Sequence, residues 1–216
     1  MKGKILGVLS VFVLFLSLSS AGYSAETEIR KLYIEAYDAK DAAKMAKVIE
    51  ENKDKIPSEI KSLLDDAVAP GTGETDRESN FYMAELMANG YKDLTGDVNP
   101  LKDVKKAVFS SKLNPSVRPE PLSGVIIVEM PEPTDAAKNV FRPDNIIIKK
   151  GMTVRWVNSD NTAHVLASMR VIGMGGLFSP SIEPGKSWEY RFEKPGEYYY
   201  ICFIHKAMVG KVTVEE

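Results

Sequence analysis

The sequence KPGEYYYICFIHKAMVGKVTV spans residues 194–214 and holds two strand patterns joined by a short loop. A Lys-Pro-Gly turn opens it. Residues 197–203 and 209–214 are rich in aromatic and β-branched side chains, which favour β-strands. Three side chains of types that can bind metals lie within seven residues, from the end of the first run to just before the second: Cys202, His205 and Met208. We therefore expect a hairpin that aims a thiolate, an imidazole and a thioether at one point.

Further strand patterns precede this hairpin in the chain. Short β-branched or alternating runs occur at residues 125–128, 146–148, 153–157 and 188–192. Turn residues, such as Pro-Gly and Lys-Gly pairs, separate the runs. Several short strands within about a hundred residues predict an antiparallel Greek-key β-sandwich over residues 122–216.

The rarest residues of the chain point to a metal site. The chain has one Cys and two His, and all three lie in the strand-rich half. His164 precedes Cys202 by 38 positions, so it would reach the loop from a different strand. A single Cys cannot form an internal disulfide, which leaves a packed thiol, a reactive thiol or a metal ligand. Each of these residues alone is more often structural, but their combination and spacing predict metal binding.

The ligand types favour copper. Two imidazoles and one thiolate with a weak axial Met form the pattern of electron-transfer copper sites. The predicted ligands of one mononuclear copper ion are His164, Cys202, His205 and Met208. Zinc also accepts His and Cys, but Met is a poor zinc ligand and structural zinc sites usually take four Cys or His ligands. Iron–sulfur clusters need more cysteines, and c-type haem needs a C-x-x-C-H motif that is absent from the sequence.

Residues 122–216 resemble the cupredoxins, the type 1 blue-copper proteins. The segments that carry the resemblance surround the four predicted ligands and are residues 151–158, 183–185, 194–200 and 210–214. The two-residue gap between His205 and Met208 is most similar to the amicyanin type. The resemblance implies an eight-strand-like Greek-key sandwich with copper near one end, three equatorial ligands (His164, Cys202 and His205) and Met208 as the axial ligand. It also implies that His205 lies at the surface and passes the electron.

Two positions depart from the amicyanin pattern. Val165 follows His164 where an Asn is usual, and Phe203-Ile204 replaces a hydroxyl residue and a Pro. The Asn normally helps to lock the ligand loop, and a Phe in the loop would exclude water from the site. Because residues around the ligands tune the metal, we expect ordinary ligation with an atypical reduction potential.

The first half of the chain has a different organisation. Residues 1–25 combine Lys2 and Lys4 with an apolar run and small residues, which predicts a signal peptide and a periplasmic or otherwise exported protein; an uncleaved anchor is the alternative. Residues 26–112 have helical periodicity and predict a small bundle of three or four helices. The proline-rich residues 113–121 form the predicted linker to the copper domain. The helical region carries no motif that identifies a family.

These features favour an extracytoplasmic electron-transfer protein that cycles between Cu(II) and Cu(I) and is not an enzyme. A multicopper oxidase or copper nitrite reductase needs several further histidines, and the chain has none to spare. The alternative is a copper carrier or sensor whose helical domain binds a partner.

The expected partners are redox proteins that dock near His205. An apolar collar of Phe203, Ile204, Ala207 and Met174 could receive them, and ordinary loop packing of these four residues is the alternative. The formal net charge of −2 gives no basic face for nucleic acid. A membrane is a partner only if residues 1–25 stay attached.

Overall fold

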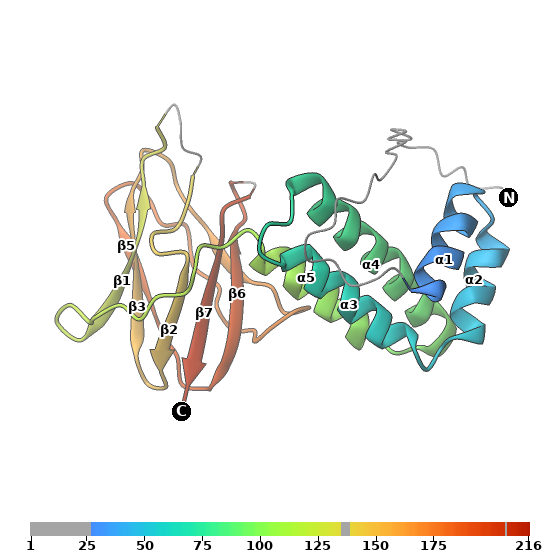
Figure 1. Cartoon of the computed structure of the whole chain (residues 1–216). Helices are drawn as coiled ribbons and strands as arrows, with labels where there is room; N and C mark the ends of the chain where they lie inside the picture. Colours follow the sequence, from blue (N-terminus) through green and yellow to red (C-terminus); the bar gives the residue numbers. More distant parts are fainter. Residues whose placement is uncertain (1–26, 135–138, 206) are drawn as a thin grey trace, which may run out of the picture.

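The computed structural model describes residues 27–134, 139–205 and 207–216. Figure 1 shows a helical region followed in the chain by a β-sandwich, which confirms the predicted multi-domain architecture. The predicted signal peptide, residues 1–25, lies outside the described residues. In the described part of the chain, no helix is both long and apolar enough to cross a membrane.

The helical region contains five described helices, so the expectation of three or four was too low. They are α1 (Glu28–Asp38), α2 (Ala42–Glu51), α3 (Ile56–Val68), α4 (Glu74–Thr95) and α5 (Asn99–Ser110). Pro residues occupy the first turns of α3 and α5, where the missing N–H has no intrahelical partner. The sequence pattern missed α2 because only Val48 and Ile49 of that helix are buried.

The helices share one apolar core. Its largest fully buried members include Tyr33 of α1, Ile49 of α2, Leu63 of α3 and Met87 of α4. Burial of such side chains stabilises the folded state by about 1.5–3 kcal/mol each. The bundle is therefore held by its own core rather than by contact with the sandwich.

The β region consists of two sheets. One has the order β1-β3-β5, and the other has the order β2-β7-β6-β4. The strands are β1 (Val125–Pro131), β2 (Asn145–Lys149), β3 (Thr153–Ser159), β4 (Leu166–Ser168), β5 (Ser187–Arg191), β6 (Gly196–Cys202) and β7 (Val209–Glu215).

Strand direction differs from the prediction of an antiparallel sandwich. β1 pairs with β3 in parallel, and β2 pairs with β7 in parallel, whereas the other named pairs are antiparallel. The described strands number seven, where the resemblance implied eight-strand-like architecture. Alternating burial along β1, β2, β3 and β7 directs every second side chain into the core between the sheets, where Trp156 and Tyr200 are fully buried.

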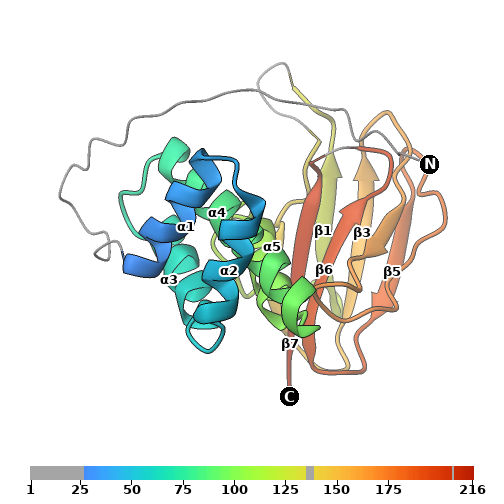
Figure 2. The ribbon, with the colours of Figure 1, turned by 90° about the vertical axis from the view of Figure 1, so that its right-hand side faces the viewer.

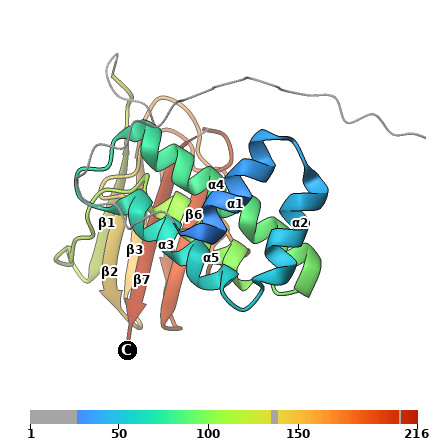
Figure 3. The same cartoon turned by 45° about the vertical axis from the view of Figure 1, so that its right-hand side comes forward.

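The helical region contacts the outer face of the four-stranded sheet. Figures 2 and 3 show helix α5 beside the sheet that carries β6 and β7. A small cluster of Phe109, Ile172 and Tyr199 is buried at this contact. Lys106 of α5 also lies 3.4 Å from the Glu197 carboxylate of β6. The predicted linker is not free of the sandwich either, because Val117 pairs with Ile146 of β2.

Candidate metal centre

The end of strand β6 positions Cys202. Side chains alternate along β6, so Tyr198, Tyr200 and Cys202 all point into the sandwich core. The Cys202 N–H donates to the Met208 carbonyl at 3.0 Å and closes the loop to β7. His205 lies in this loop, so the register of the β6–β7 hairpin places its imidazole near the thiol.

His164 reaches the same point from the segment between β3 and β4. Its N–H donates to the Ile182 carbonyl at 3.1 Å, and its carbonyl accepts from the Ile182 N–H at 2.8 Å. The side chain is fully buried. Two residues further on, Leu166 of β4 pairs with Cys202 of β6, so the residue 38 positions before Cys202 lies next to it.

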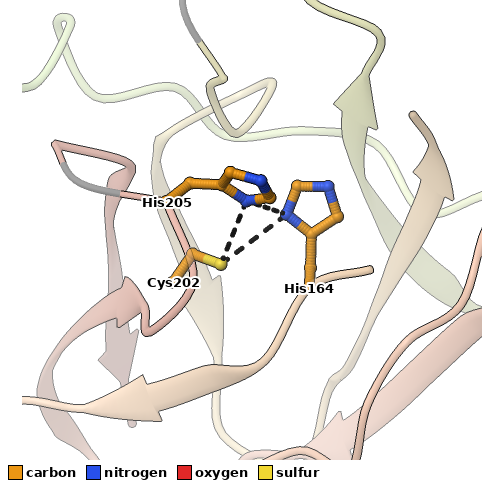
Figure 4. Close-up of side chains that lie close together, drawn as sticks. All are labelled: His164, Cys202 and His205. Atoms are coloured by element: carbon orange, nitrogen blue, oxygen red, sulfur yellow. Dashed lines mark hydrogen bonds between the residues drawn. The ribbon is translucent and has the colours of Figure 1, made fainter. Parts of the chain in front are cut away.

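Three of the four predicted ligands converge (Figure 4). The ligand atoms of His164, Cys202 and His205 all lie within 4.8 Å of one another. Each histidine Nδ1 is 3.6 Å from the Cys202 Sγ, and the two Nδ1 atoms are 3.1 Å apart. Two nitrogens bound to one ion at about 2 Å lie about 3 Å apart, so these separations fit a three-coordinate plane around a single ion. The donor set, two imidazoles and one thiolate, suits copper in either oxidation state.

The surroundings of Cys202 favour its thiolate. Burial acts to raise the pKa of the thiol, but a hydrogen bond with His164 and backbone N–H groups of His205, Val165 and Ile204 outweigh it. The result lowers the Cys202 pKa to about 6. The thiolate is the metal-binding form of cysteine, so the protein provides it near neutral pH before any metal arrives.

A buried carboxylate lies behind His164. Asp160 is 3% exposed, and its Oδ2 is 3.0 Å from the His164 Nε2. Burial acts to raise the Asp160 pKa, but hydrogen bonds from Thr162, Asn161 and His164 together lower it. Sequence reasoning missed Asp160 and Thr162, because the run Ser159-Asp-Asn-Thr162 has the composition of an ordinary turn. The available signal was a carboxylate four residues before a predicted ligand.

Met208 stays the predicted axial ligand. Its side chain is 1% exposed and belongs to the core cluster that contains Cys202. Its N–H donates to the His205 carbonyl at 3.3 Å, so His205 and Met208 are the two ends of one hydrogen-bonded turn.

Asn158 and the two positions that depart from the amicyanin pattern have defined places. Asn158 holds the segment before His164, since its Nδ2 donates to the carbonyls of Thr162 and Ile182, both at 2.8 Å. The Val165 carbonyl accepts from the Phe203 N–H at 2.8 Å. Phe203 is 64% exposed, so most of its ring contacts solvent instead of excluding water from Cys202, and that expectation was wrong.

The predicted apolar collar is only partly assembled. Phe203 and Ile204 are exposed beside His205. Met174 instead packs against Gly196, and its N–H donates to the Glu197 carbonyl. Gly196 begins β6 and Cys202 ends it, so Met174 lies about 20 Å along the strand from the site. Including Met174 in the collar was wrong, because its sequence position gave no information on which end of β6 it joins.

Comparisons with known proteins find a matching family and similar proteins. The chain matches the model of the copper binding proteins, plastocyanin/azurin family, over residues 128–215, a range that holds all four predicted ligands. It is 31% identical over 113 residues to amicyanin from Paracoccus denitrificans, covering 51% of this chain and 79% of that protein. It is 30% identical over 90 residues to plastocyanin from Scenedesmus fuscus, covering 38% of this chain and 92% of that protein. A solved purple cupredoxin from Nitrosopumilus maritimus is 33% identical with a TM-score of 0.38, covering 42% of this chain and 99% of that one.

Proposed function

The chain belongs to the plastocyanin/azurin family of copper-binding proteins, and we propose that it carries single electrons between redox proteins on one type 1 copper. His164, Cys202 and His205 are the proposed equatorial ligands, and Met208 is the proposed axial ligand. Copper supplies the Cu(II)/Cu(I) couple, and the protein supplies a fixed set of ligands for it. The observation that carries the proposal is the convergence of both histidines of the chain on its only cysteine.

The rigidity of the ligand set supports electron transfer. Thiolate and thioether favour Cu(I), while imidazole also suits Cu(II). His164 and Cys202 are buried in hydrogen-bonded backbone, so neither has room to move when the charge of the ion changes. A site that needs little rearrangement between the two states exchanges electrons quickly.

The proposed electron port is His205. It is half-buried, unlike His164, and the exposed side chains of Phe203 and Ile204 lie in the same loop. Partner proteins would dock on this apolar surface and exchange the electron through the imidazole. Both histidines are used in this one site, so none is left for the second copper cluster of an oxidase or a nitrite reductase. An exported location, through residues 1–25, is part of the proposal.

The test is a titration of the metal-free protein with Cu(II), followed by optical and EPR spectra. We expect an intense blue thiolate-to-copper band at one equivalent, and its loss in Cys202→Ser. Met208→Leu should change the EPR parameters of the bound copper, whereas Met174→Leu, at the far end of β6, should leave them unchanged. A colourless product that binds zinc equally well would contradict the proposal.

The competing function is a copper carrier or sensor. The one feature that favours a carrier or sensor is the helical region, which offers a second surface for a partner. Fast electron self-exchange with slow loss of copper to a chelator supports the shuttle. Rapid handover of copper to the chelator supports the carrier.

A further inference from the structure

A pocket of about 370 Å³ opens at the end of the sandwich opposite the proposed copper site. Its walls come from the segment 170–176, the end of β5 and the turn that leads into β6. Gly196 begins β6 and Cys202 ends it, which separates the pocket from the metal centre by about 20 Å of strand. Pockets of this volume hold small organic ligands in other proteins.

Positive charge predominates in the wall of this pocket. Its charged side chains are Arg170, Arg191, Glu193 and Lys194. Glu193 lies 2.5 Å from Arg191 and neutralises that residue alone. Arg170 and Lys194 pair with no carboxylate among the residues that the structure describes. Three cations and one carboxylate give the wall a formal charge of +2, which matches a dianion.

Three of the lining residues offer further hydrogen-bond donors. The Tyr190 hydroxyl and the N–H groups of Gly175 and Gly176 make no hydrogen bond to any described residue. Successive N–H groups in a turn with a left-handed residue often bind anions, and Gly176 has a φ of +104°. A wall of charged and uncharged donors suits a ligand with several acceptor oxygens.

The two glycines let these donors lie close to the backbone. A methyl group at Gly175 would lie 2.6 Å from the Arg170 Nε, and one at Gly176 would lie 2.9 Å from the Tyr190 hydroxyl oxygen. Both separations are shorter than the optimal contact of about 3.5 Å. Arg170 and Tyr190 therefore rest directly on the glycine backbone.

The segment that carries Arg170 is fixed to the sheet on both sides. The Met169 N–H donates to the Tyr199 carbonyl at 2.6 Å, and the Met174 N–H donates to the Glu197 carbonyl at 2.7 Å. Ile172, between them, is buried in the contact with the helical region. Because the segment is already ordered, a ligand would not have to order it, which lowers the entropic cost of binding.

We propose that this pocket binds a phosphate dianion, either free or as the end group of a small phosphomonoester, between Arg170, Lys194 and the Gly175–Gly176 backbone. The fork of a guanidinium matches two phosphate oxygens, and the lysine adds a point charge. The pocket is larger than one phosphate ion, so it also has room for the organic group of an ester. The site is independent of copper and gives the chain a second ligand.

The first experiment titrates the metal-free full-length chain with inorganic phosphate and with glycerol 3-phosphate at slightly alkaline pH. Amide NMR should show saturable shifts at Gly175 and Gly176, with a dissociation constant of about 1 mM or lower, as for two or three charge-assisted hydrogen bonds. Tighter binding of glycerol 3-phosphate would identify an ester as the occupant, and equal or weaker binding would identify free phosphate. The same shifts with sodium chloride at equal ionic strength, or no saturable shift, would overturn the proposal.

The second experiment removes single charges. Arg170→Gln and Lys194→Gln should each weaken phosphate binding about tenfold or more, the loss for one charge-assisted hydrogen bond. The control is Lys186→Gln, which removes the same charge from an exposed side chain just before β5, at the opposite end of that strand from Arg191. An equal loss in Lys186→Gln would mean that net charge, and not this pocket, sets the affinity.

The third experiment tests geometry at constant charge. Gly175→Ala keeps every charge, and its methyl group displaces the Arg170 side chain, so affinity should fall nearly as far as in Arg170→Gln. Lys102 of α5 lines a neighbouring hollow on the other side of Arg170, and Lys102→Gln should keep wild-type affinity. A loss in Lys102→Gln with none in Lys194→Gln would place the anion in that hollow and refute the assignment. If Gly175→Ala fails to fold, the single-charge variants decide.

Discussion

Phe109 of helix α5 packs edge-on against Tyr199 of strand β6, with ring centroids 5.3 Å apart and planes at 85°. Tyr199 precedes the proposed ligand Cys202 by three residues in the same strand. Because side chains alternate along a strand, Tyr199 faces the helices while Tyr200 and Cys202 face the sandwich core. One strand thus contributes both to the contact with the helical region and to the proposed metal site.

Phe109→Ala should weaken this contact without changing the metal site. Phe109 is 7% exposed, so its loss removes apolar burial and leaves a cavity, and we expect the free energy of unfolding to fall by about 3 kcal/mol. The measurement is urea unfolding, with the copper spectrum recorded in parallel. Phe178→Ala is the control, since Phe178 is 66% exposed and its loss should change stability little. Equal effects of the two variants would contradict the prediction.

Arg30 should be essential to the helical bundle. Its guanidinium lies 2.9 Å from Glu59 and 3.0 Å from Asp66, and all three side chains are buried. Arg30→Met would leave the carboxylates without their cation, which costs about 3–5 kcal/mol for a buried pair. Urea unfolding measures the loss.

Arg118, in the predicted linker, offers a matched control for Arg30. Arg118 also contacts a carboxylate through two nitrogens, at 2.7 and 2.8 Å from Glu215, but this pair is exposed. Arg118→Met should therefore have little effect on stability, since exposed ion pairs are screened by water. A loss in Arg118→Met as large as in Arg30→Met would mean that burial does not set the difference.

Stability should depend on pH through Glu197. Its partial burial acts to raise the Glu197 pKa, but Lys211 at 2.6 Å and Lys106 at 3.4 Å outweigh it and lower the pKa. Because the Glu197 pKa is lower in the folded protein, the ionised carboxylate stabilises the fold at pH values above its unfolded pKa of about 4.5. This stabilisation disappears as the pH falls through the pKa of the folded state. Glu197→Gln should thus be less stable than wild type at pH 7, with a difference that shrinks toward pH 3. The difference should be modest because the carboxylate is partly exposed, and a difference undiminished at pH 3 would contradict the assignment.

Gly210→Ala should disturb the strand that follows the proposed ligand loop. A methyl group at Gly210 would overlap the phenol carbon and oxygen of Tyr200. Tyr200 is fully buried and accepts a hydrogen bond from Trp156, so it has no room to yield. We expect a loss of about 1–3 kcal/mol in urea unfolding, as for overpacked cores, and a changed copper EPR spectrum because Met208 lies two residues away. Wild-type stability together with a wild-type spectrum would show that β7 can shift freely.

The sequence by itself determined the class of site and the two kinds of region. With one Cys and two His in the chain, few ligand sets are open, and the chemistry of these side chains favours copper whatever the fold that holds them. Helical and strand periodicities are local properties, because they reflect which side chains a regular backbone turns toward the core. The sequence therefore predicted α3, where buried positions recur every three to four residues, and β3, where every second side chain is buried.

Only the tertiary structure decided which distant residues meet. The parallel pairings β1–β3 and β2–β7 join segments that no local pattern links. Met174 lies at the far end of β6, while Phe109 reaches Tyr199 across the two regions. Asp160 and Thr162 look like ordinary turn residues, and only the folded chain brings them within hydrogen-bond distance of two imidazoles that lie 4 and 45 residues further along the chain than Asp160. Hydrogen bonds require distances of about 3 Å, and such distances between separate segments follow from packing and not from composition.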